Sequence, residues 1–182
     1  MCILETKRCL LKKFTKNDFD LLFSVHGSEE IMALVGKGAR TKEEVQGNLN
    51  NIVAHQEKYA FSAWAVFDKE TGQFIGRAGL VHMGTLVEMV MMDKKNVPIE
   101  VGYMLHPDYW GKGLATELSN AIIKWGFENT DLQEIVAKTG VDNKVSQRVI
   151  QKNNMTFRQN IEIEGRSGLL FSITRQEHNQ TK

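Results

Sequence analysis

The chain has 182 residues, with 23 Lys and Arg against 22 Asp and Glu, so its formal net charge is +1 at pH 7. This length predicts one domain over 1–182, with a core over about 4–175 and a polar tail. The balanced charge disfavours nucleic acid as a partner, because neutralising phosphates requires clustered cations. No apolar run is long enough for a membrane span, and the first residues lack the layout of a signal peptide.

The cysteine and histidine content argues against disulfides and metals. Cys2 and Cys9 are the only cysteines, and they form no CxxC motif. We therefore expect two reduced thiols and a cytoplasmic protein. The five histidines do not combine with Cys or carboxylates at ligand spacing, so no metal is expected. Lone histidines such as His26 and His55 are interpreted as structural, and His82 ends a strand.

The first part of the chain predicts a strand followed by helices. Residues 3–12 are expected to form one strand. The run 15–18 (TKND) fits a capping box before a first helix, and a second helical segment runs from Ser28 to about Val35. The run 41–44 (TKEE) caps a longer helix, whose apolar stripe consists of Val45, Leu49, Ile52 and Val53.

Three strands follow, over 61–67, 73–82 and 99–105. The first is apolar on both faces, so helices must flank the sheet on both sides. Between the second and third lies the Met-rich stretch 86–92. It either lines an acceptor site or dimer contact, as adaptable Met-rich surfaces do, or forms an extended strand packed on the core.

The last part of the chain predicts alternating helices and strands. Leu114, Leu118, Ala121, Ile122 and Trp125 form the apolar stripe of a helix. A strand at 134–139, a helix at 143–152 and a hairpin over 159–174 follow, and the tail after Arg175 is expected to fray. The whole pattern predicts an α/β (α+β) fold, a mixed, mostly antiparallel sheet with helices on both faces.

The stretch 109–117 (YWGKGLATE) is the most informative part of the sequence. It links the strand ending at Leu105 to a helix start through two glycines. Small residues let a ligand approach the main chain, and the free N–H groups of a first helical turn attract anions. The stretch therefore predicts a cradle for a phosphorylated ligand.

Two common cradles do not fit this stretch. A Walker loop requires GxxxxGK[ST], and no such run occurs. Gly111 and Gly113 supply the GxG of a dinucleotide fingerprint, but Thr116 stands where a third glycine is required, and the turn lies past the middle of the chain. A dinucleotide-dependent oxidoreductase is therefore disfavoured.

The sequence resembles the GNAT-superfamily N-acetyltransferases, in the branch similar to the ribosomal-protein N-terminal acetyltransferases (RimJ/RimL-like). The branch wording "GY…P.YWGKG.ATE" is matched by, among others, Gly102, Tyr103, Pro107, Tyr109, Trp110, Gly111, Gly113, Ala115, Thr116 and Glu117. Trp110 departs from the Gln or Arg of the wider superfamily but is usual in this branch. Stretches 5–18, 75–80 and 141–157 match other segments of the family in the expected order.

The resemblance implies acetyl-CoA as the cofactor and assigns its contacts. The main chain from Gly111 to Thr116 would hold the diphosphate, with Trp110 and Leu114 in the same motif. Lys112 either adds a cation or is a solvated loop lysine. A splayed strand would offer free backbone groups to the pantetheine arm and acetyl carbonyl, from Val101 to His106, chiefly from Met104 and Leu105.

Glu100 is the candidate general base, directly or through water. Strand alternation places it on the face of Gly102 and Met104, opposite Val101 and Tyr103. A carboxylate beside an apolar cleft has the raised pKa that a base needs. The alternative is a solvated strand glutamate without a role.

Asn143 and Ser146 have two interpretations. An Asn at a helix start with a Ser three residues on forms an ordinary N-cap. In similar proteins the Asn amide binds the pantetheine arm, and the Ser hydroxyl lies near the sulfur as a proton donor. Many superfamily members use a Tyr on this helix instead, but residues 144–152 contain none.

The sequence therefore predicts acetyl transfer from acetyl-CoA to a primary amine, by direct attack in a ternary complex. The acceptor is either a protein N-terminus or a small molecule, and the protein is a monomer or a homodimer. The alternative is a non-catalytic acyl-CoA-binding or regulatory module on the same fold.

Overall fold

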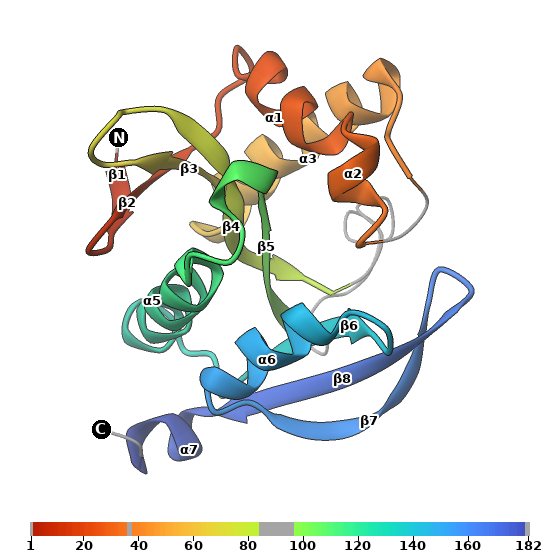
Figure 1. Cartoon of the computed structure of the whole chain (residues 1–182). Helices are drawn as coiled ribbons and strands as arrows, with labels where there is room; N and C mark the ends of the chain where they lie inside the picture. Colours follow the sequence, from red (N-terminus) through yellow and green to blue (C-terminus); the bar gives the residue numbers. More distant parts are fainter. Residues whose placement is uncertain (1, 36–37, 84–96, 181–182) are drawn as a thin grey trace.

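The protein is built around one eight-stranded sheet with the strand order β1-β2-β3-β4-β5-β6-β8-β7 (Figure 1). The computed structural model describes residues 2–35, 38–83 and 97–180. The strands are β1 (Cys2–Glu5), β2 (Cys9–Lys13), β3 (Ala63–Asp68), β4 (Phe74–His82), β5 (Ile99–Leu105), β6 (Glu134–Gly140), β7 (Thr156–Ile163) and β8 (Arg166–Thr174). The helices are α1 (Phe19–His26), α2 (Glu29–Met32), α3 (Lys42–Tyr59), α5 (Leu114–Asn129), α6 (Lys144–Lys152) and α7 (Arg175–Gln180), with a short 3₁₀ helix η2 at Pro107–Tyr109.

All neighbouring strands in this sheet are antiparallel except β5 and β6, which run parallel. A parallel pair requires a crossover connection, and α5 supplies it. The predicted fold class, a mostly antiparallel sheet flanked by helices, is confirmed.

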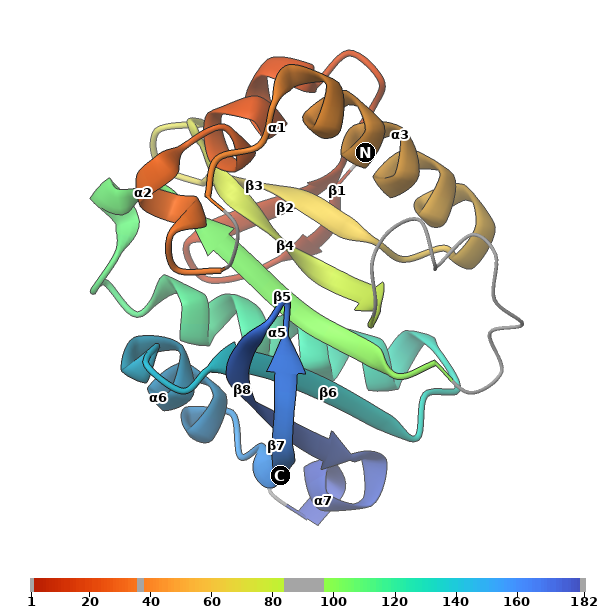
Figure 2. The same cartoon turned by 90° about the vertical axis from the view of Figure 1, so that its right-hand side faces the viewer.

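Helices cover both faces of the sheet (Figure 2). On one face α1 and α3 pack through Leu22, Val45, Leu49 and Ile52 onto Ala63 and Ala65 of β3. On the other face α5 buries Leu114, Leu118, Ile122 and Phe127 against the β-strands. The apolar run of β3 is therefore covered on both sides, as the sequence predicted.

Three local expectations need correction. Residues 3–12 form two strands because Thr6 turns the chain, with its N–H donating to the Cys9 carbonyl at 2.9 Å. At the start of α1, Asp18 makes no side-chain cap, since its carboxylate accepts from the N–H and hydroxyl of Thr15 at 2.7 Å. The tail after Arg175 forms α7, whose Glu177 accepts from the N–H of Thr174 at 2.7 Å. The Met-rich stretch 86–92 lies outside the described residues.

Candidate active site

The start of α5 leaves its main-chain donors unused. Gly113 is the N-cap residue, has φ +77°, and makes no side-chain cap. The first hydrogen bond into the helix runs from Glu117 N–H to the Gly113 carbonyl at 3.1 Å. Among the described residues, the N–H groups from Gly111 through Thr116 have no hydrogen-bond acceptor. Together with the helix dipole, these donors favour a negatively charged group at this helix start.

Beside this helix start the sheet opens between β5 and β6. The two strands share one register pair, Glu100 with Val136, whereas β5 stays paired with β4 over seven positions and β6 with β8 over seven. The part of β5 beyond Glu100 therefore has no strand on one side. The predicted splay is present, and it leads directly to the cradle.

The register of β5 decides which backbone groups face the opening. The His106 N–H donates to the Ile75 carbonyl at 2.9 Å, and the Met104 carbonyl lies against Gly76 of β4. Alternation therefore turns the backbone groups of Tyr103 and Leu105 toward the opening. Met104 and His106 do not offer the free backbone groups that the sequence predicted. The Met104 carbonyl and the His106 N–H face β4, and the His106 carbonyl accepts from the Tyr109 N–H at 2.9 Å. The Leu105 carbonyl also has a partner, the Trp110 indole N–H at 2.7 Å.

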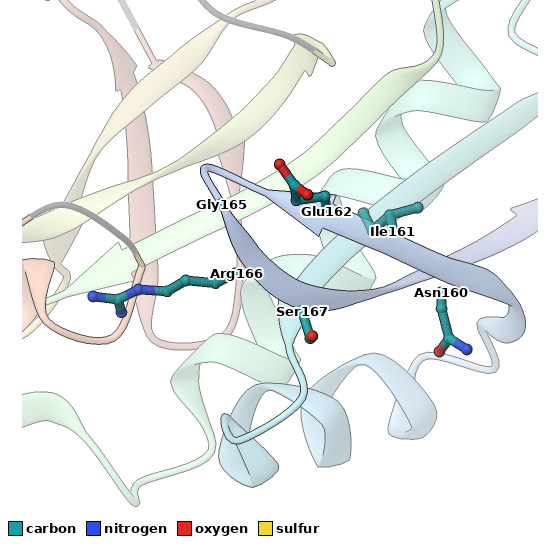
Figure 3. A pocket seen from close by; sticks show the side chains of 6 residues that line it. All are labelled: Asn160, Ile161, Glu162, Gly165, Arg166 and Ser167. Carbon is teal, nitrogen blue, oxygen red and sulfur yellow. The ribbon is translucent and has the colours of Figure 1, made fainter.

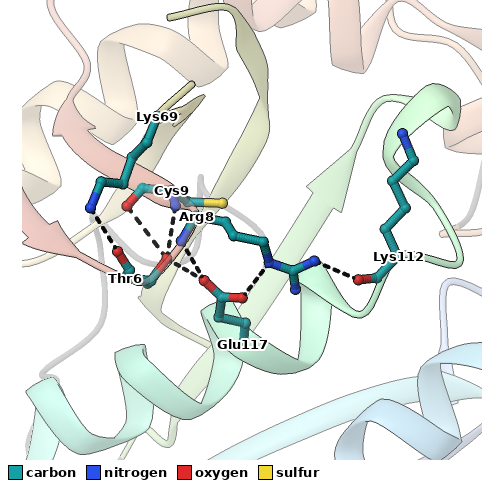
Figure 4. A network of polar contacts seen from close by, with 6 residues as sticks. All are labelled: Thr6, Arg8, Cys9, Lys69, Lys112 and Glu117. Atoms are coloured by element: carbon teal, nitrogen blue, oxygen red, sulfur yellow. Dashed lines mark hydrogen bonds and ion pairs between the residues drawn. The ribbon is translucent and has the colours of Figure 1, made fainter. Parts of the chain in front are cut away.

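A polar cluster fastens the cradle to the N-terminal hairpin (Figure 4). Glu117, on the first turn of α5, accepts from the Thr6 hydroxyl at 2.7 Å, from the Arg8 N–H at 2.9 Å and from Arg8 Nε at 2.7 Å. Arg8 Nη1 also donates to the Lys112 carbonyl at 2.9 Å. Burial acts to raise the pKa of Glu117, but the hydrogen bonds from Thr6 and Arg8 outweigh it and lower the pKa. Lys112 itself is exposed, with Nζ 5.2 Å from the centre of the Tyr109 ring.

Ser146 lies at the start of α6, where it contacts the N-cap residue Asn143 and the side chain of Tyr103. The Asn143 Oδ1 accepts from the Ser146 N–H at 3.0 Å, so the N-cap interpretation of this pair is confirmed. The Asn143 Nδ2 donates to the Leu34 carbonyl at 3.3 Å. The Ser146 hydroxyl is 2.9 Å from the hydroxyl of Tyr103, which projects from β5. Burial raises the pKa of Tyr103, so this phenol stays protonated at neutral pH.

Glu100 lies on the face of β5 opposite Tyr103, and its side chain is 14% exposed. Its Oε2 is 3.3 Å from Lys138 Nζ on β6. Burial raises the pKa of Glu100, while Lys138 and Arg77 act in the opposite direction. The glutamate is therefore neither solvated nor isolated; it is a shielded carboxylate between two cations.

A hollow on the β7–β8 hairpin is lined by Asn160, Ile161, Glu162, Gly165, Arg166 and Ser167 (Figure 3). None of the predicted site residues lines it, so it is not the candidate active site. The described residues contain no group of three or more metal-ligating side chains. None of their helices is long and apolar enough to cross a membrane.

The sheet thus opens between its two parallel strands, and an uncapped helix start lies beside the opening. Residues 8–156 match the acetyltransferase (GNAT) domain family, and the chain belongs to that family.

Relatives and solved structures agree with this family. The chain is 28% identical over 158 residues to the uncharacterized protein YkkB of Bacillus subtilis (strain 168), covering 87% of each chain. Its fold is similar to RimL, a ribosomal L7/L12 alpha-N-protein acetyltransferase in complex with coenzyme A, with a TM-score of 0.77 and 13% identity over 97% of this chain and 99% of that one. It is also similar to a spermidine N-acetyltransferase from Vibrio cholerae in complex with CoA and spermine, with a TM-score of 0.73 and 17% identity over 94% and 98%.

The structure adds residues that sequence reasoning missed. Tyr103 faces Ser146 from strand β5, whereas the sequence analysis considered only a tyrosine on the helix at 144–152. Strand alternation, which places Tyr103 on the face opposite Glu100, was the pattern that could have indicated this tyrosine. Arg8 and Lys138 gave no signal, because their partners are distant in the chain.

Proposed function

We propose that the protein transfers the acetyl group of acetyl-CoA to a primary amine, by direct attack in a ternary complex. The observation that supports this most strongly is the row of free N–H groups from Gly111 to Thr116 beside the opened edge of β5. A diphosphate fits such donors, and an extended pantetheine arm fits an open strand edge. Family membership and coenzyme A in the two structural neighbours support the same cofactor.

Most of the predicted cofactor residues have a specific part in this proposal; Met104 and His106 do not, because their backbone groups already have partners. The main chain of Gly111, Lys112, Gly113, Leu114, Ala115 and Thr116 holds the diphosphate. The Leu105 N–H and the backbone of Tyr103 pair with the pantetheine arm, and Asn143 flanks it. Trp110 acts through the Leu105 carbonyl, which it holds at 2.7 Å, and thereby fixes the end of β5 relative to the cradle.

The reaction itself requires two proton transfers at opposite faces of β5. Bound acetyl-CoA would supply a thioester carbonyl, whose carbon bonds to the amine nitrogen as the carbon–sulfur bond breaks. Glu100 takes the proton that the amine nitrogen loses, directly or through water, and Ser146 gives its hydroxyl proton to the departing sulfur. Tyr103 replaces that proton on Ser146 across the 2.9 Å hydrogen bond. A backbone N–H aimed at the developing oxyanion contributes about 3 kcal/mol.

The raised pKa of Glu100 gives this proposal a pH dependence. The base must be ionised to act, so the rate rises with pH as Glu100 loses its proton, at a pH above its ordinary value of 4.5. Measuring kcat/KM against pH for the wild type and for Glu100→Gln tests this assignment. We expect the acidic limb to disappear in the variant and kcat to fall about 100-fold, with coenzyme A affinity unchanged.

The direct test of the function is release of free thiol from acetyl-CoA in the presence of amine acceptors. Lys124→Gln, at an exposed position on α5, serves as a matched control and should behave as the wild type. Binding of coenzyme A without thiol release from any acceptor would instead favour the non-catalytic acyl-CoA-binding module.

We also propose that the chain belongs to the branch similar to the ribosomal-protein N-terminal acetyltransferases, on the strength of the motif at 102–117. The acceptor is then a protein N-terminal amine or a small amine, and the protein acts as a monomer or homodimer without nucleic acid or membrane. The free thiols of Cys2 and Cys9 support a reducing compartment such as the cytoplasm.

A further inference from the structure

A second polar residue shares the sheet face of Glu100. Arg77 of β4 pairs with Met104 of β5, and residues paired across two strands point to the same face. Glu100 lies on that face, as does Val81, which packs under α1 and α3. Arg77 and Glu100 are close enough for each to shift the pKa of the other.

The guanidinium of Arg77 is largely unused by the protein. Its Nε donates to His26 Nε2 at 2.8 Å. Within the described part of the chain, its two Nη groups make no hydrogen bond, and neither is sealed from solvent. Burial lowers the pKa of Arg77 to about 10, and Glu100 partly offsets the effect, so the group is charged at neutral pH.

His26 is the residue that orients Arg77. Burial, together with the charges of Arg77 and Arg40, lowers the pKa of His26 to about 3, so its ring is neutral. Because Arg77 can only donate, His26 Nε2 accepts the hydrogen bond. A neutral ring held in this way fixes the direction of the guanidinium without neutralising its charge.

The close ion pairs that the structure describes around this face involve cations other than Arg77. Lys138 faces Glu100 at 3.3 Å, and Arg40 of the segment before α3 faces Glu164 of the β7–β8 turn at 3.6 Å. Each of these cations therefore has its own carboxylate. Arg77 forms no ion pair among the described residues, although an unpaired charge in a partly buried position is costly.

We propose that Arg77 binds a carboxylate on the amine acceptor, so that the acceptor is an acidic amine rather than a polycation. This proposal rests on the proposed function and specifies its substrate class. A guanidinium fork presents two parallel N–H groups, which match the two oxygens of a carboxylate. A carboxylate held there leaves the amine end of the same molecule beside Glu100, whose Oε1 makes no hydrogen bond to a described residue. A polyamine would add cations to a face that already has one in excess.

The test compares matched acceptors that differ only in charge. The full-length protein with saturating acetyl-CoA is assayed by thiol release with β-alanine against its amide, and with the peptide amides Ser-Asp-Phe against Ser-Asn-Phe. These two pairs distinguish a small acidic amine from a protein N-terminus with an acidic side chain. Spermidine is the cationic comparison.

We expect the wild type to prefer the acidic member of at least one pair by 10-fold or more in kcat/KM. In Arg77→Gln that preference should be lost, through a KM increase of about 10- to 100-fold for the acidic member. In Arg77→Gln, kcat/KM for the amide member should change by less than about twofold. In the control Lys16→Gln, at an exposed position, kcat/KM for both members should change by less than about twofold. If Arg77→Gln does not fold by circular dichroism, Arg77→Lys decides, since it keeps the charge but loses the fork and should lose most of the preference.

The proposal is overturned if the wild type prefers the amides or spermidine, or if the preference survives both Arg77 variants. Transfer to amines without any dependence on their charge removes this inference but leaves the proposed function intact. Thiol release with none of the amines contradicts both.

Discussion

The two long helices of this protein begin in opposite ways. At the start of α3 the Glu44 N–H donates to the Thr41 hydroxyl at 3.2 Å, and the Thr41 N–H donates to the Glu44 carboxylate at 2.8 Å. At the start of α5 the N-cap is Gly113, which has no side chain to offer. The carboxylate of Glu117, on the first turn of α5, binds Thr6 and Arg8 and not the N–H groups of the helix start.

We propose that this difference separates a structural helix start, in α3, from a ligand-binding one, in α5. Free N–H groups at a helix start cost stability unless something accepts their hydrogen bonds. In α3 the protein satisfies its own donors. In α5 the donors stay free, and Glu117 and Arg8 hold the turn in place without blocking it.

The largest expected effect comes from closing the cradle. Gly113→Asp places a carboxylate where the diphosphate would lie, at a residue with φ +77°. We expect coenzyme A affinity to fall about 100-fold, since hydrogen bonds to a charged group contribute about 1.5–3 kcal/mol. Calorimetric titration measures this. The matched control is Gly47→Ala in α3, where an added Cβ meets nothing within 4 Å; it should stabilise the protein by about 0.5–1 kcal/mol with unchanged affinity.

Tyr103→Phe tests whether the open side of β5 serves the reaction. The change removes the hydroxyl 2.9 Å from Ser146 and leaves the ring. We expect kcat to fall about 10-fold in Tyr103→Phe and about 100-fold in Ser146→Ala. Coenzyme A affinity should be unchanged in both variants. Equal losses of affinity and rate in steady-state and binding measurements would contradict the assignment and indicate a structural pair.

Glu117→Gln weakens the attachment of the cradle to the N-terminal hairpin. Because the pKa of Glu117 is lowered in the folded protein, its contribution to stability is present above its ordinary value of 4.5 and is lost as pH falls through the lowered pKa. Urea unfolding should show the variant less stable by up to about 1 kcal/mol at pH 7, for this partly exposed pair. The two proteins should converge in acid, and coenzyme A binding should weaken several-fold at pH 7. A difference that persists at pH 3 would rule out the ionised carboxylate as its source.

The smallest effect on function is expected at the capped helix. Thr41→Ala removes one half of the capping box and should lower the free energy of unfolding by about 1 kcal/mol. Coenzyme A affinity and kcat should not change, because the capping box at this helix start joins only Thr41 and Glu44. Denaturant unfolding and thiol release on the same preparation check both; a loss of cofactor affinity would remove the distinction between the two helices.

Much of this protein follows from local sequence. Alternation and apolar stripes predicted β3, β4, β5, α3 and α5, and the residues of 41–44 specified their own cap. The shape of the turn at 111–113 was predictable because it depends on two glycines separated by one residue, and the backbone conformation of glycine is a local property. The left-handed Asn154 after α6, φ +58°, was predictable for the same reason.

The tertiary structure decided what depends on distant partners. Which of Met104, Leu105 and His106 offers free backbone groups was set by the register with β4. Three contacts join segments that are far apart in the chain: Ser146 with Tyr103, Glu100 with Lys138, and Arg8 with Glu117. Sequence patterns report which face a residue occupies, but only the packing of strands and helices determines which side chains meet across that face.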